Sequence, residues 1–578
     1  MLTRKRTTCL AAVVLLLLGA CGPTATATPA PSPTSPRAQA TATPKPTTAP
    51  SPGVTPMATP VAAPKPTAPP GAAQPKYGGV LRTVAPTGSS WDPFISRFQD
   101  PQIAMSFMHA KLTMMSLAEE QCTFWPNSPQ LAESWSWVND STLDLKVRPG
   151  VKFQNLPPMN GREVTAADVA YTVNEQWKKK AGIAPSVVLI DRVEAVDKYT
   201  ARFYLKQPFP LITDKIDGVY FAWIIGPEMF AGGAIQKGEQ NVGLGPFMFK
   251  SHTPGVKTEF KRNPDFFRTG LPYLDGVEML VMDDVALQVA ALRAGKLDWL
   301  YVLTPFLNVE LEHTLPKLKV ADCPGPPSGY ALYMLYGKPP FDDIRVRRAI
   351  SMALDRKGVA EKVMQGKGIV LYSSVFATYP EALKLEDYPP EVRQWLEYNP
   401  QRARQLMAEA GYPNGFRTVM YTQNIQPERN HTETASALLA DIGIRADIKM
   451  LTATEYNDQI YGGKFQEGIA VARAGSGDVH TNLYDPYHSS AIPARNRARI
   501  SDPKLDKMLD DFTLEKDPKR RIELARQIQI YTVDQAYLVF LPREITGAYA
   551  MPWVRNLYYR GADVRSQGDY LFRVWMDK

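Results

Sequence analysis

Acidic and imidazole side chains gather between residues 478 and 488. Asp478, His480, Asp485 and His488 lie within eleven residues of one another, and carboxylate and imidazole groups together suit a divalent cation. Their spacing matches no dedicated metal motif, and Pro486 is expected to break any helix that would align them. We therefore expect solvated loop residues and no metal site here, with a metal or its chelate as an alternative ligand class.

The sequence carries none of the local motifs that mark common hydrolases and nucleotide-dependent enzymes. It has six histidines but no His-Glu-x-x-His pair for zinc, no Gly-x-Ser-x-Gly elbow and no glycine-rich phosphate loop. Paired carboxylates for glycoside hydrolysis have no fixed sequence spacing, because their geometry is spatial. We expect no catalytic residue and no cofactor, and a secreted hydrolase is the alternative class.

The charge of the chain is concentrated in its first 76 residues. The net charge is +8 over 578 residues, but residues 1–76 hold seven basic side chains and no acidic one. The remaining 502 residues carry 59 basic and 58 acidic side chains, which argues against a nucleic-acid partner. With 44% hydrophobic and 10% aromatic residues, the body can bury a core, so disorder of the whole is excluded.

An export signal is predicted at the start of the chain. Basic residues 4–6 precede an apolar run at 10–18 and the small residues Gly19 and Ala20. The run is shorter than the roughly 20 residues of a spanning helix, so a transmembrane anchor is the less favoured interpretation. Leu18-Gly19-Ala20-Cys21 resembles a bacterial lipobox, in which the cysteine receives a diacylglyceryl group. We predict a lipoprotein signal peptide at 1–20 and lipidation of Cys21.

Residues 21–76 are expected to form the lipidated cysteine and a disordered tether. Residues 22–76 hold 16 of the 51 prolines among Thr, Ala and Ser, with no aromatic or acidic residue. Such a segment cannot bury enough apolar area to offset its ordering entropy. It would span roughly 170 Å as polyproline II and nearer 40 Å as a coil. Its composition also allows O-glycosylation.

Two cysteines remain in the predicted body. Cys9 leaves with the signal peptide, and Cys122 and Cys323 lie on the side of the membrane where disulfides persist. A disulfide between them and a pair of inert buried thiols both stay open, because the sequence supplies no distance.

Helix caps and apolar periodicity predict helices and strands in mixed order after residue 77. Val285, Val289 and Leu292 are expected to face inward from a helix, and Gly243-Leu-Gly-Pro-Phe is expected to turn into a strand. Strand patterns are predicted at 80–84, 135–147 and 444–450. The predicted helices are 165–180, 284–294, one from Asp343, 399–411 and 435–442. The order favours an α/β body with mixed sheets.

Eight segments of the body together resemble one known family. They are 78–82 (Gly-Gly-Val-Leu-Arg) with 91–93 (Trp-Asp-Pro), 147–153 (Val-Arg-Pro-Gly-Val-Lys-Phe), 164–169 (Val-Thr-Ala-Ala-Asp-Val), 243–247, 262–267 (Arg-Asn-Pro-Asp-Phe-Phe), 293–298 (Arg-Ala-Gly-Lys-Leu-Asp), 340–349 (Pro-Phe-Asp-Asp-Ile-Arg-Val-Arg-Arg-Ala) and 408–413 (Ala-Glu-Ala-Gly-Tyr-Pro). Each alone is a common turn or cap. In this order they resemble the extracytoplasmic solute-binding proteins of family 5, which serve peptide, dipeptide and nickel ABC importers.

The resemblance covers most of 77–578 and implies a fold. That fold is α/β and two-lobed, periplasmic-binding-protein-like (type II, cluster C), with hinge strands and a satellite domain. It implies a first lobe from 77–115, 215–330 and 530–578, a satellite domain at 116–214, and a second lobe at 331–529. The discontinuous assembly comes from the family and not from periodicity.

The resemblance also implies a function. The chain would be the substrate-binding lipoprotein of an ABC importer, a monomer anchored to the outer face of the cytoplasmic membrane. It would capture a small polar solute, with a short peptide favoured, and deliver it to the permease subunits without altering it. Oligosaccharides, opines and metal chelates are alternatives, because the same family takes them up.

A candidate binding site follows from the oligopeptide-binding relatives. In them an Ala-Arg-Ala-Gly strand opens onto the cleft, and an aspartate that pairs with the α-ammonium group follows it. Residues 472–475 match that strand. Asp478 follows it one position earlier than the aspartate does in those relatives. Arg473 can pair bidentately with a carboxylate and Asp478 with an amine, which together suit a zwitterion.

The predicted site differs from that of the oligopeptide-binding relatives at one residue, and it has a second wall. Ser476 stands where those relatives have a tryptophan, which removes a stacking surface. By position after Asp92-Pro93, residues 97–99 should line the other wall. The predicted ligand-binding residues are Arg473, Ala474, Gly475, Ser476, Asp478, Arg97, Phe98 and Gln99.

Overall fold

The computed structural model describes most of the chain after residue 73. The described residues are 74–85, 92, 94, 99–118, 123–179, 187–218, 222–237, 240–302, 305–315, 317–320, 329–377, 379–426, 428–475, 478–544, 547–557 and 571–578. The chain divides into the compact units Met1–Thr55 and Pro56–Lys578, and all described residues belong to the second. The predicted signal peptide, Cys21, Cys122 and Cys323 lie outside the described residues.

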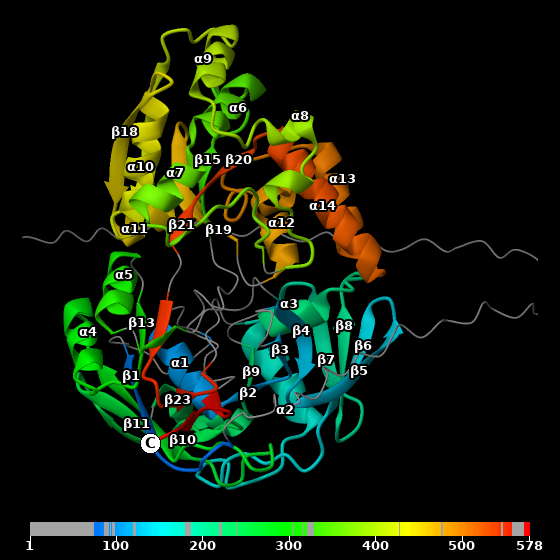
Figure 1. Cartoon of the computed structure of the whole chain (residues 1–578). Helices are drawn as coiled ribbons and strands as arrows, with labels where there is room; N and C mark the ends of the chain where they lie inside the picture. Colours follow the sequence, from blue (N-terminus) through cyan, green and yellow to red (C-terminus); the bar gives the residue numbers. More distant parts are fainter. Residues whose placement is uncertain are drawn as a thin grey trace, which may run out of the picture. The chain divides into compact units, whose positions relative to one another are not determined.

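Four strands form the main sheet of what we call the first lobe, in the order β1-β12-β11-β10 (Figure 1). They are β1 (Val80–Ala85), β12 (Gly276–Val281), β11 (Lys257–Arg262) and β10 (Phe247–Thr253). β1 runs parallel to β12, and the other neighbours are antiparallel. The strand predicted at 80–84 is therefore confirmed.

Smaller elements complete the first lobe. The strands are β13 (Trp299–Val302), β22 (Gly547–Ala550) and β14 (Lys319–Val320) in one sheet, and the pairs β2 (Ala110–Lys111) with β9 (Trp223–Ile224) and β23 (Val554–Arg555) with β24 (Trp575–Met576). The helices are α1 (Gln99–Met108), α4 (Val285–Arg293), α5 (Pro305–Thr314) and the 3₁₀ turns η3 (Pro227–Met229) and η4 (Ala231–Gln236).

Asp298 binds two distant parts of the first lobe together. Its fully buried carboxylate accepts hydrogen bonds from the Arg82 guanidinium at 2.9 and 3.1 Å, from Trp553 Nε1 at 2.8 Å and from Lys578 Nζ at 3.0 Å. Burial alone would raise its pKa, but these donors hold the pKa of Asp298 below its usual value. The motifs at 78–82 and 293–298 thus have a scaffold role.

Gly243 and Gly245 allow a close backbone approach. A Cβ atom at Gly243 would lie 2.2 Å from the carbonyl oxygen of Met108, and one at Gly245 would lie 2.3 Å from that of Phe107. The end of α1 therefore packs directly on this segment, and the Gly245 N–H donates to the Met108 carbonyl at 2.7 Å. The predicted strand follows as β10 from Phe247.

A second four-stranded sheet, in the order β5-β6-β8-β7, forms the core of a group that we call the satellite. Its elements are β3 (Thr113–Ala118), β4 (Thr123–Pro129), β5 (Ala132–Asn139), β6 (Thr142–Val147), α2 (Ala166–Tyr171), the π-helical turn η1 (Thr172–Trp177), β7 (Ile190–Ala195), β8 (Thr200–Leu205) and α3 (Ile212–Gly218). The strand pattern predicted over 135–147 is confirmed, and the structure divides it into the two strands β5 and β6.

The capping box predicted before α2 is confirmed. The Thr165 N–H donates to the Asp168 carboxylate at 2.9 Å. Val169, Val173 and Trp177 are all fully buried along the helical run, as their four-residue spacing predicts. The described helix ends at Trp177, three residues before the predicted end.

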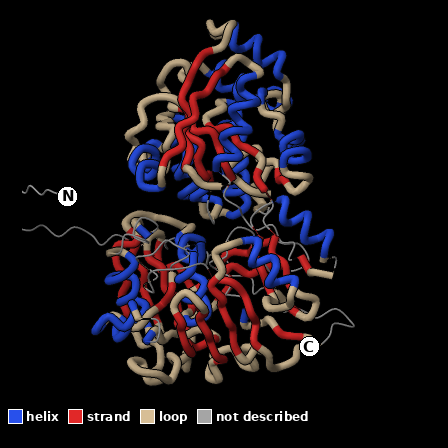
Figure 2. Tube along the Cα trace, turned by 90° about the vertical axis from the view of Figure 1, so that its left-hand side faces the viewer, coloured by secondary structure: helices blue, strands red, loops and turns tan. Residues whose placement is uncertain are grey.

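Five strands form the sheet of the second lobe, in the order β18-β17-β19-β15-β20 (Figures 1 and 2). They are β15 (Gly329–Met334), β17 (Phe416–Gln423), β18 (Ile444–Leu451), β19 (Ile469–Ala474) and β20 (Leu538–Leu541), with the small pair β16 (Gly368–Ile369) and β21 (Arg543–Glu544) beside them. Alternate residues of β15 enter different hydrophobic clusters, Tyr330 and Leu332 one and Ala331 and Tyr333 the other. Both faces of this sheet are therefore covered.

Helices of the second lobe begin at caps that the sequence predicts. Asp343 accepts from the Arg345 N–H at 2.8 Å and Asn399 from the Arg402 N–H at 3.0 Å. The helices are α6 (Ile344–Ala353), α7 (Arg356–Gly358), the π-helical turn η6 (Val359–Val363), the 3₁₀ turn η7 (Leu385–Asp387), α8 (Pro390–Arg393), α9 (Pro400–Glu409), α10 (Glu428–Ala440), α11 (Ala453–Tyr456), the π-helical turn η8 (Asn457–Tyr461), α12 (Val479–Tyr487), the 3₁₀ turn η9 (Ser489–Ala491), α13 (Pro503–Leu514) and α14 (Pro518–Asp534).

Two details of the predicted helices are wrong. Val285 was expected inside, but it is 39% exposed, because only Val289, Ala291 and Leu292 of α4 face the core. The helix predicted at 435–442 begins seven residues earlier, at Glu428, and these added residues include side chains of the candidate site described below.

The chain passes between the two lobes at paired strands. β14 of the first lobe precedes β15 of the second, and β20 and β21 of the second precede β22 of the first. β14 pairs antiparallel with β22, and β15 pairs antiparallel with β20. The predicted boundary at 529 falls before β20, which belongs to the second-lobe sheet. Within the described residues, no helix combines the length and apolar character needed to span a bilayer.

Candidate functional site

Arg473 lies at the end of β19 and is held from two sides. Its Nε donates to the Glu428 carboxylate at 3.0 Å, and its guanidinium lies 5.8 Å from the ring centre of Tyr330, the residue opposite it on β15. The Arg473 side chain is 48% exposed, whereas that of Glu428 is 5% exposed. The guanidinium is thus anchored by a buried acid and partly open to solvent.

The electrostatic surroundings keep Arg473 charged. Burial opposes the charge, but Tyr330 and Glu428 together raise the pKa of Arg473 above its usual value. Glu428 is the first residue of α10, where the helix dipole favours a carboxylate. One turn later His431 stacks on Tyr330, with ring centres 4.1 Å apart, and contacts Glu544 at 3.0 Å.

The backbone at Arg473 is fixed by Arg497. The Nη1 atom of Arg497 donates to the Arg473 carbonyl at 2.8 Å. The Arg497 guanidinium lies 4.3 Å from the ring centre of Tyr461 and 5.2 Å from that of Tyr333. The end of β19 is therefore held by a buried cation that is itself surrounded by aromatic rings.

Gly475 follows in a conformation that favours glycine. Its φ is +92°, and a Cβ atom there would lie 2.6 Å from the ring of Phe376. Any residue with a Cβ atom would be strained where the chain turns away from β19.

Asp478 caps α12 and is paired with a lysine. Its Oδ1 accepts from the Thr481 N–H at 2.7 Å, and its Oδ2 accepts from the Thr481 hydroxyl at 2.6 Å. Lys215 Nζ, from α3 of the satellite, lies 3.5 Å from both carboxylate oxygens and also donates to the Thr481 hydroxyl. Any ligand amine at Asp478 would therefore compete with Lys215.

His480 lies on a helix and His488 caps the C-terminal end of that helix, contrary to expectation. α12 runs from Val479 to Tyr487 and includes Pro486, one residue before its end. His480 and His488 are each 8% exposed, so the prediction of solvated loop residues is wrong. Among the described residues, no three His, Cys, Asp or Glu side chains come together in a way that could hold a metal ion.

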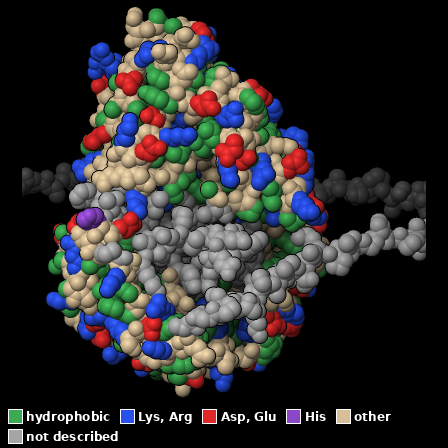
Figure 3. Space-filling model, in the orientation of Figure 1, with side chains coloured by type: hydrophobic (Ala, Val, Ile, Leu, Met, Phe, Trp, Pro, Cys, Tyr) green, Lys and Arg blue, Asp and Glu red, His purple; other side chains and the backbone are tan. Residues whose placement is uncertain are grey.

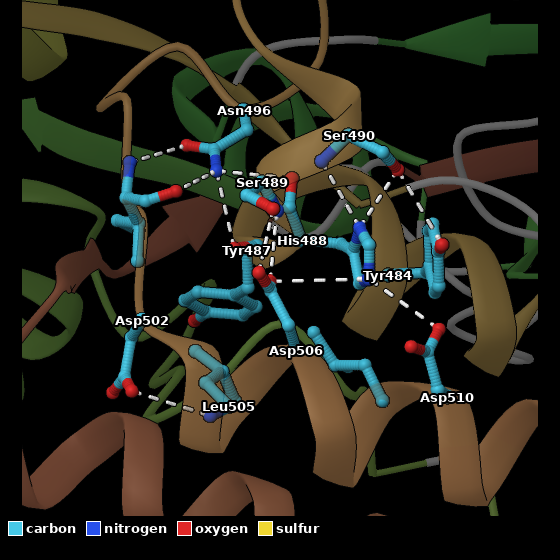
Figure 4. A network of polar contacts seen from close by, with 12 residues as sticks. Tyr484, Tyr487, His488, Ser489, Ser490, Asn496, Asp502, Leu505, Asp506 and Asp510 are labelled. Carbon is cyan, nitrogen blue, oxygen red and sulfur yellow. Dashed lines mark hydrogen bonds and ion pairs between the residues drawn. The ribbon is translucent and has the colours of Figure 1, made fainter.

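Both histidines belong to an aromatic and polar network, and Figure 4 shows the part of it around His488. Tyr484 stacks between His480 and His488, with ring centres at 5.0 and 4.2 Å. The Ser490 N–H donates to His488 Nδ1 at 3.1 Å, and His488 Nε2 lies 3.4 Å from Asp510. Burial lowers the pKa of His480 to about 3, so that ring is neutral at physiological pH. The network has a sufficient structural role in joining α12 to α13.

The other predicted site residues are placed differently. The Ala474 side chain is buried in the core, so only its backbone remains for a ligand. Gln99 opens α1, and its side chain is not described. Arg97, Phe98 and Ser476 lie outside the described residues. The structure brings Arg473, Gly475 and Asp478 onto one segment.

Lys215 and Glu428 contact residues of the candidate site, and the sequence analysis did not predict either of them. Lys215 is 263 positions from Asp478, and Glu428 is 45 positions from Arg473. No local sequence pattern can predict pairs of residues that are this far apart in the chain. The only available signal was an acid near the start of a helix, and the predicted helix began too late to include Glu428.

Charged side chains of both signs are mixed over the described surface in Figure 3. This mixture agrees with the near-neutral charge of the body and gives the face in view no uniformly basic area of the kind that nucleic acid requires.

Comparisons with known proteins give a consistent result. The profile of the bacterial extracellular solute-binding proteins, family 5 Middle, matches residues 128–493. Heme-binding protein A of Haemophilus influenzae is 26% identical over 457 residues, which cover 74% of this chain and 81% of that protein. The dipeptide-binding protein of Pseudomonas aeruginosa is 25% identical over 467 residues, which cover 75% and 85%.

A solved structure shares the fold. The ABC transporter-associated periplasmic binding protein DppA from Helicobacter pylori, in complex with the peptide STSA, matches with a TM-score of 0.70 and 23% sequence identity. The match covers 87% of this chain and 99% of that one. The expected two-lobed α/β fold is thereby confirmed.

Proposed function

Since the chain belongs to the bacterial extracellular solute-binding proteins of family 5, we propose that it captures a small carboxylate-bearing solute and delivers it to the permease subunits of an ABC importer. Proteins of this family are transport binding proteins that act outside the cytoplasm. The protein would bind its solute and release it unchanged, so it is not an enzyme in this proposal.

The observation that carries the proposal is the presentation of Arg473. A guanidinium anchored through Nε by a buried acid and partly exposed is well suited to bind a carboxylate with its remaining N–H groups. Heme, dipeptides and the peptide STSA, which the names of the similar proteins give as their ligands, all carry carboxylates. Arg473 with the backbone of Ala474, Gly475 and Ser476 would form one wall, and Arg97, Phe98 and Gln99 the other.

A short peptide is the favoured solute. Two of these three similar proteins are named for, or are bound to, peptides. A metal chelate of the heme kind is the second candidate, because it also carries carboxylates and is the ligand in the name of the relative from H. influenzae.

Capture would proceed by closure of the two lobes. The paired strands β14–β22 and β15–β20 support a hinge, because the polypeptide passes between the lobes beside them. A solute that contacts both lobes binds the closed form better and so shifts the population toward it. The proposal keeps the expected first lobe at 77–115, 215–330 and 530–578, the second lobe at 331–529 and the satellite at 116–214, with two changes. The satellite extends to the end of α3, and the second lobe extends to the end of β21.

The protein would act as a monomer attached to the outer face of the cytoplasmic membrane. Lipidation of Cys21 would supply the anchor, and residues 22–76 would supply the spacer. Two acyl chains give durable attachment, since each buried methylene contributes about 0.8 kcal/mol.

Calorimetric titration of ligand-free protein tests the function. The panel would contain di- and tripeptides with a free C-terminal carboxylate, the same peptides as carboxamides, and heme. We expect at least one free acid to bind, and its amide to bind about ten- to a hundredfold more weakly, because a charge-assisted hydrogen bond contributes about 1.5–3 kcal/mol.

Two variants test whether the preference for the free acid over the amide depends on Arg473. Arg473→Gln should weaken binding of the free acid by a similar factor and make acid and amide alike. Arg417→Gln is the matched control, because Arg417 pairs with Asp447 at an exposed position on β17. Equal binding of acids and amides to the wild type, or full affinity in Arg473→Gln, would refute the role of Arg473.

A further inference from the structure

Lys215 and Asp478 form a largely buried ion pair beside the candidate site. Their side chains are 15% and 14% exposed. Both carboxylate oxygens of Asp478 already accept hydrogen bonds from Thr481, and Lys215 Nζ lies 3.5 Å from each of them. The acid is therefore supplied with donors and with a countercharge by the protein itself.

The position of Lys215 is fixed by its surroundings. On α3 the neighbouring Ile212 and Ile216 are each only 1% exposed and anchor the helix in the core. A second contact joins the same two segments, because the rings of Phe209 and His480 lie 5.1 Å apart in an edge arrangement. Lys215 thus reaches Asp478 from a helix that is anchored in the core, and the pair joins α3 of the satellite to α12 of the second lobe when closure brings these parts together.

The charges around the pair are consistent with one resident cation. Burial would raise the pKa of Asp478, but Lys215 holds it below the usual value. His480 is neutral, and burial raises the pKa of nearby Asp485, which also lies 3.7 Å from Arg495. A second ammonium group at Asp478 would meet the repulsion of Lys215, and the nearby acid Asp485 already has Arg495 at 3.7 Å.

We propose that Lys215 determines the specificity of the site by occupying the place beside Asp478 that a ligand amine would otherwise take. The solute is then an anionic one, bound through a carboxylate at Arg473 and carrying no free ammonium group at Asp478, as in a peptide whose amine is acylated. This inference rests on the proposed function. It narrows the solute class, since Asp478 no longer selects for a zwitterion.

Amine rescue tests the role of Lys215 without knowledge of the solute. Lys215→Ala leaves a buried carboxylate without its cation and a space of side-chain size. We expect a lower melting temperature in this variant, and its recovery on addition of millimolar propylammonium chloride at constant ionic strength. The wild type should show no such response, because its own lysine fills the place.

Two controls make the rescue specific. Lys516→Ala removes a lysine that pairs with Asp140 at exposed positions, and propylammonium should not stabilise it. The double variant Lys215→Ala/Asp478→Asn keeps a capping side chain at position 478 but has no charge to attract the amine, so rescue should disappear. If propylammonium stabilises Lys215→Ala no more than the wild type or the double variant, the inference is overturned.

Titration with trialanine and N-acetyl-trialanine tests the consequence for binding. The wild type should bind the two forms with equal affinity or prefer the acetylated one, and Lys215→Ala should prefer the free amine by about tenfold, the effect of one charge-assisted contact. A clear preference of the wild type for the free amine would overturn the inference. Failure of both peptides to bind either protein would count against a peptide solute, and the amine rescue would still decide the role of Lys215.

Discussion

Arg473 has a side chain that is held at Nε and at its backbone, while the remaining N–H groups of the guanidinium are available for a ligand. Glu428 holds its Nε, Arg497 holds its carbonyl oxygen, and Tyr330 lies beneath its guanidinium. A side chain held in this way loses little further conformational entropy when it binds a carboxylate. We infer that the affinity of the site depends on these supports as well as on Arg473 itself.

Gly475 offers a prediction about the same segment. Gly475→Ala should lose about 2–5 kcal/mol of unfolding free energy, because it combines a positive φ with a contact of 2.6 Å to Phe376. Gly337 is the matched control, since it has φ +74° but no atom within 4 Å of a Cβ. Gly337→Ala should lose only about 1–2 kcal/mol. Denaturant unfolding measures both, and equal losses would show that the Phe376 contact is relieved without cost.

At the scale of residues, the sequence could predict the candidate-site residues that lie together on one segment of the chain. Arg473, Gly475 and Asp478 follow one another in the chain, so a family pattern could point to them together. Lys215 could not be found in this way, because its partner lies 263 positions later and the pairing depends on the folded arrangement of α3 and α12. The same holds for Glu428.

At the scale of elements, local signals predicted helix starts best. Asp343 and Asn399 act as caps because each has a side-chain oxygen that can accept a backbone N–H of the first turn. Pro486 misled, because a proline disrupts the helix that continues beyond it, and only Tyr487 of α12 follows this one. The prediction that Val285 is buried was wrong, because periodicity does not show which turns of α4 pack against the rest of the protein.

The N-terminal segment gives a prediction at the element scale. Cys21→Ser should abolish incorporation of labelled fatty acid and release the protein from membranes, because the hydroxyl of serine does not replace the thiol that lipidation uses. Cell fractionation with metabolic labelling measures both effects, and Cys9→Ser should leave them unchanged. Labelling of Cys21→Ser at the wild-type level would contradict the proposed anchor.

At the scale of the whole molecule, the sheets join segments that are far apart in the chain. β1 pairs with β12, and β15 pairs with both β19 and β20. Periodicity reports which residues are buried but not which strands are neighbours, so this arrangement could be expected only through the family resemblance. For the same reason the predicted boundary at 529 missed β20.

The central claim is that the protein holds a carboxylate-bearing solute through Arg473 and does not change it. Native mass spectrometry of protein from its producing organism, beside the Arg473→Gln variant made in the same way, tests this most directly. The account predicts one small acid bound per wild-type chain, recovered intact after prolonged incubation and depleted in the variant. A chemically altered solute, or the same occupancy in Arg473→Gln, would contradict it.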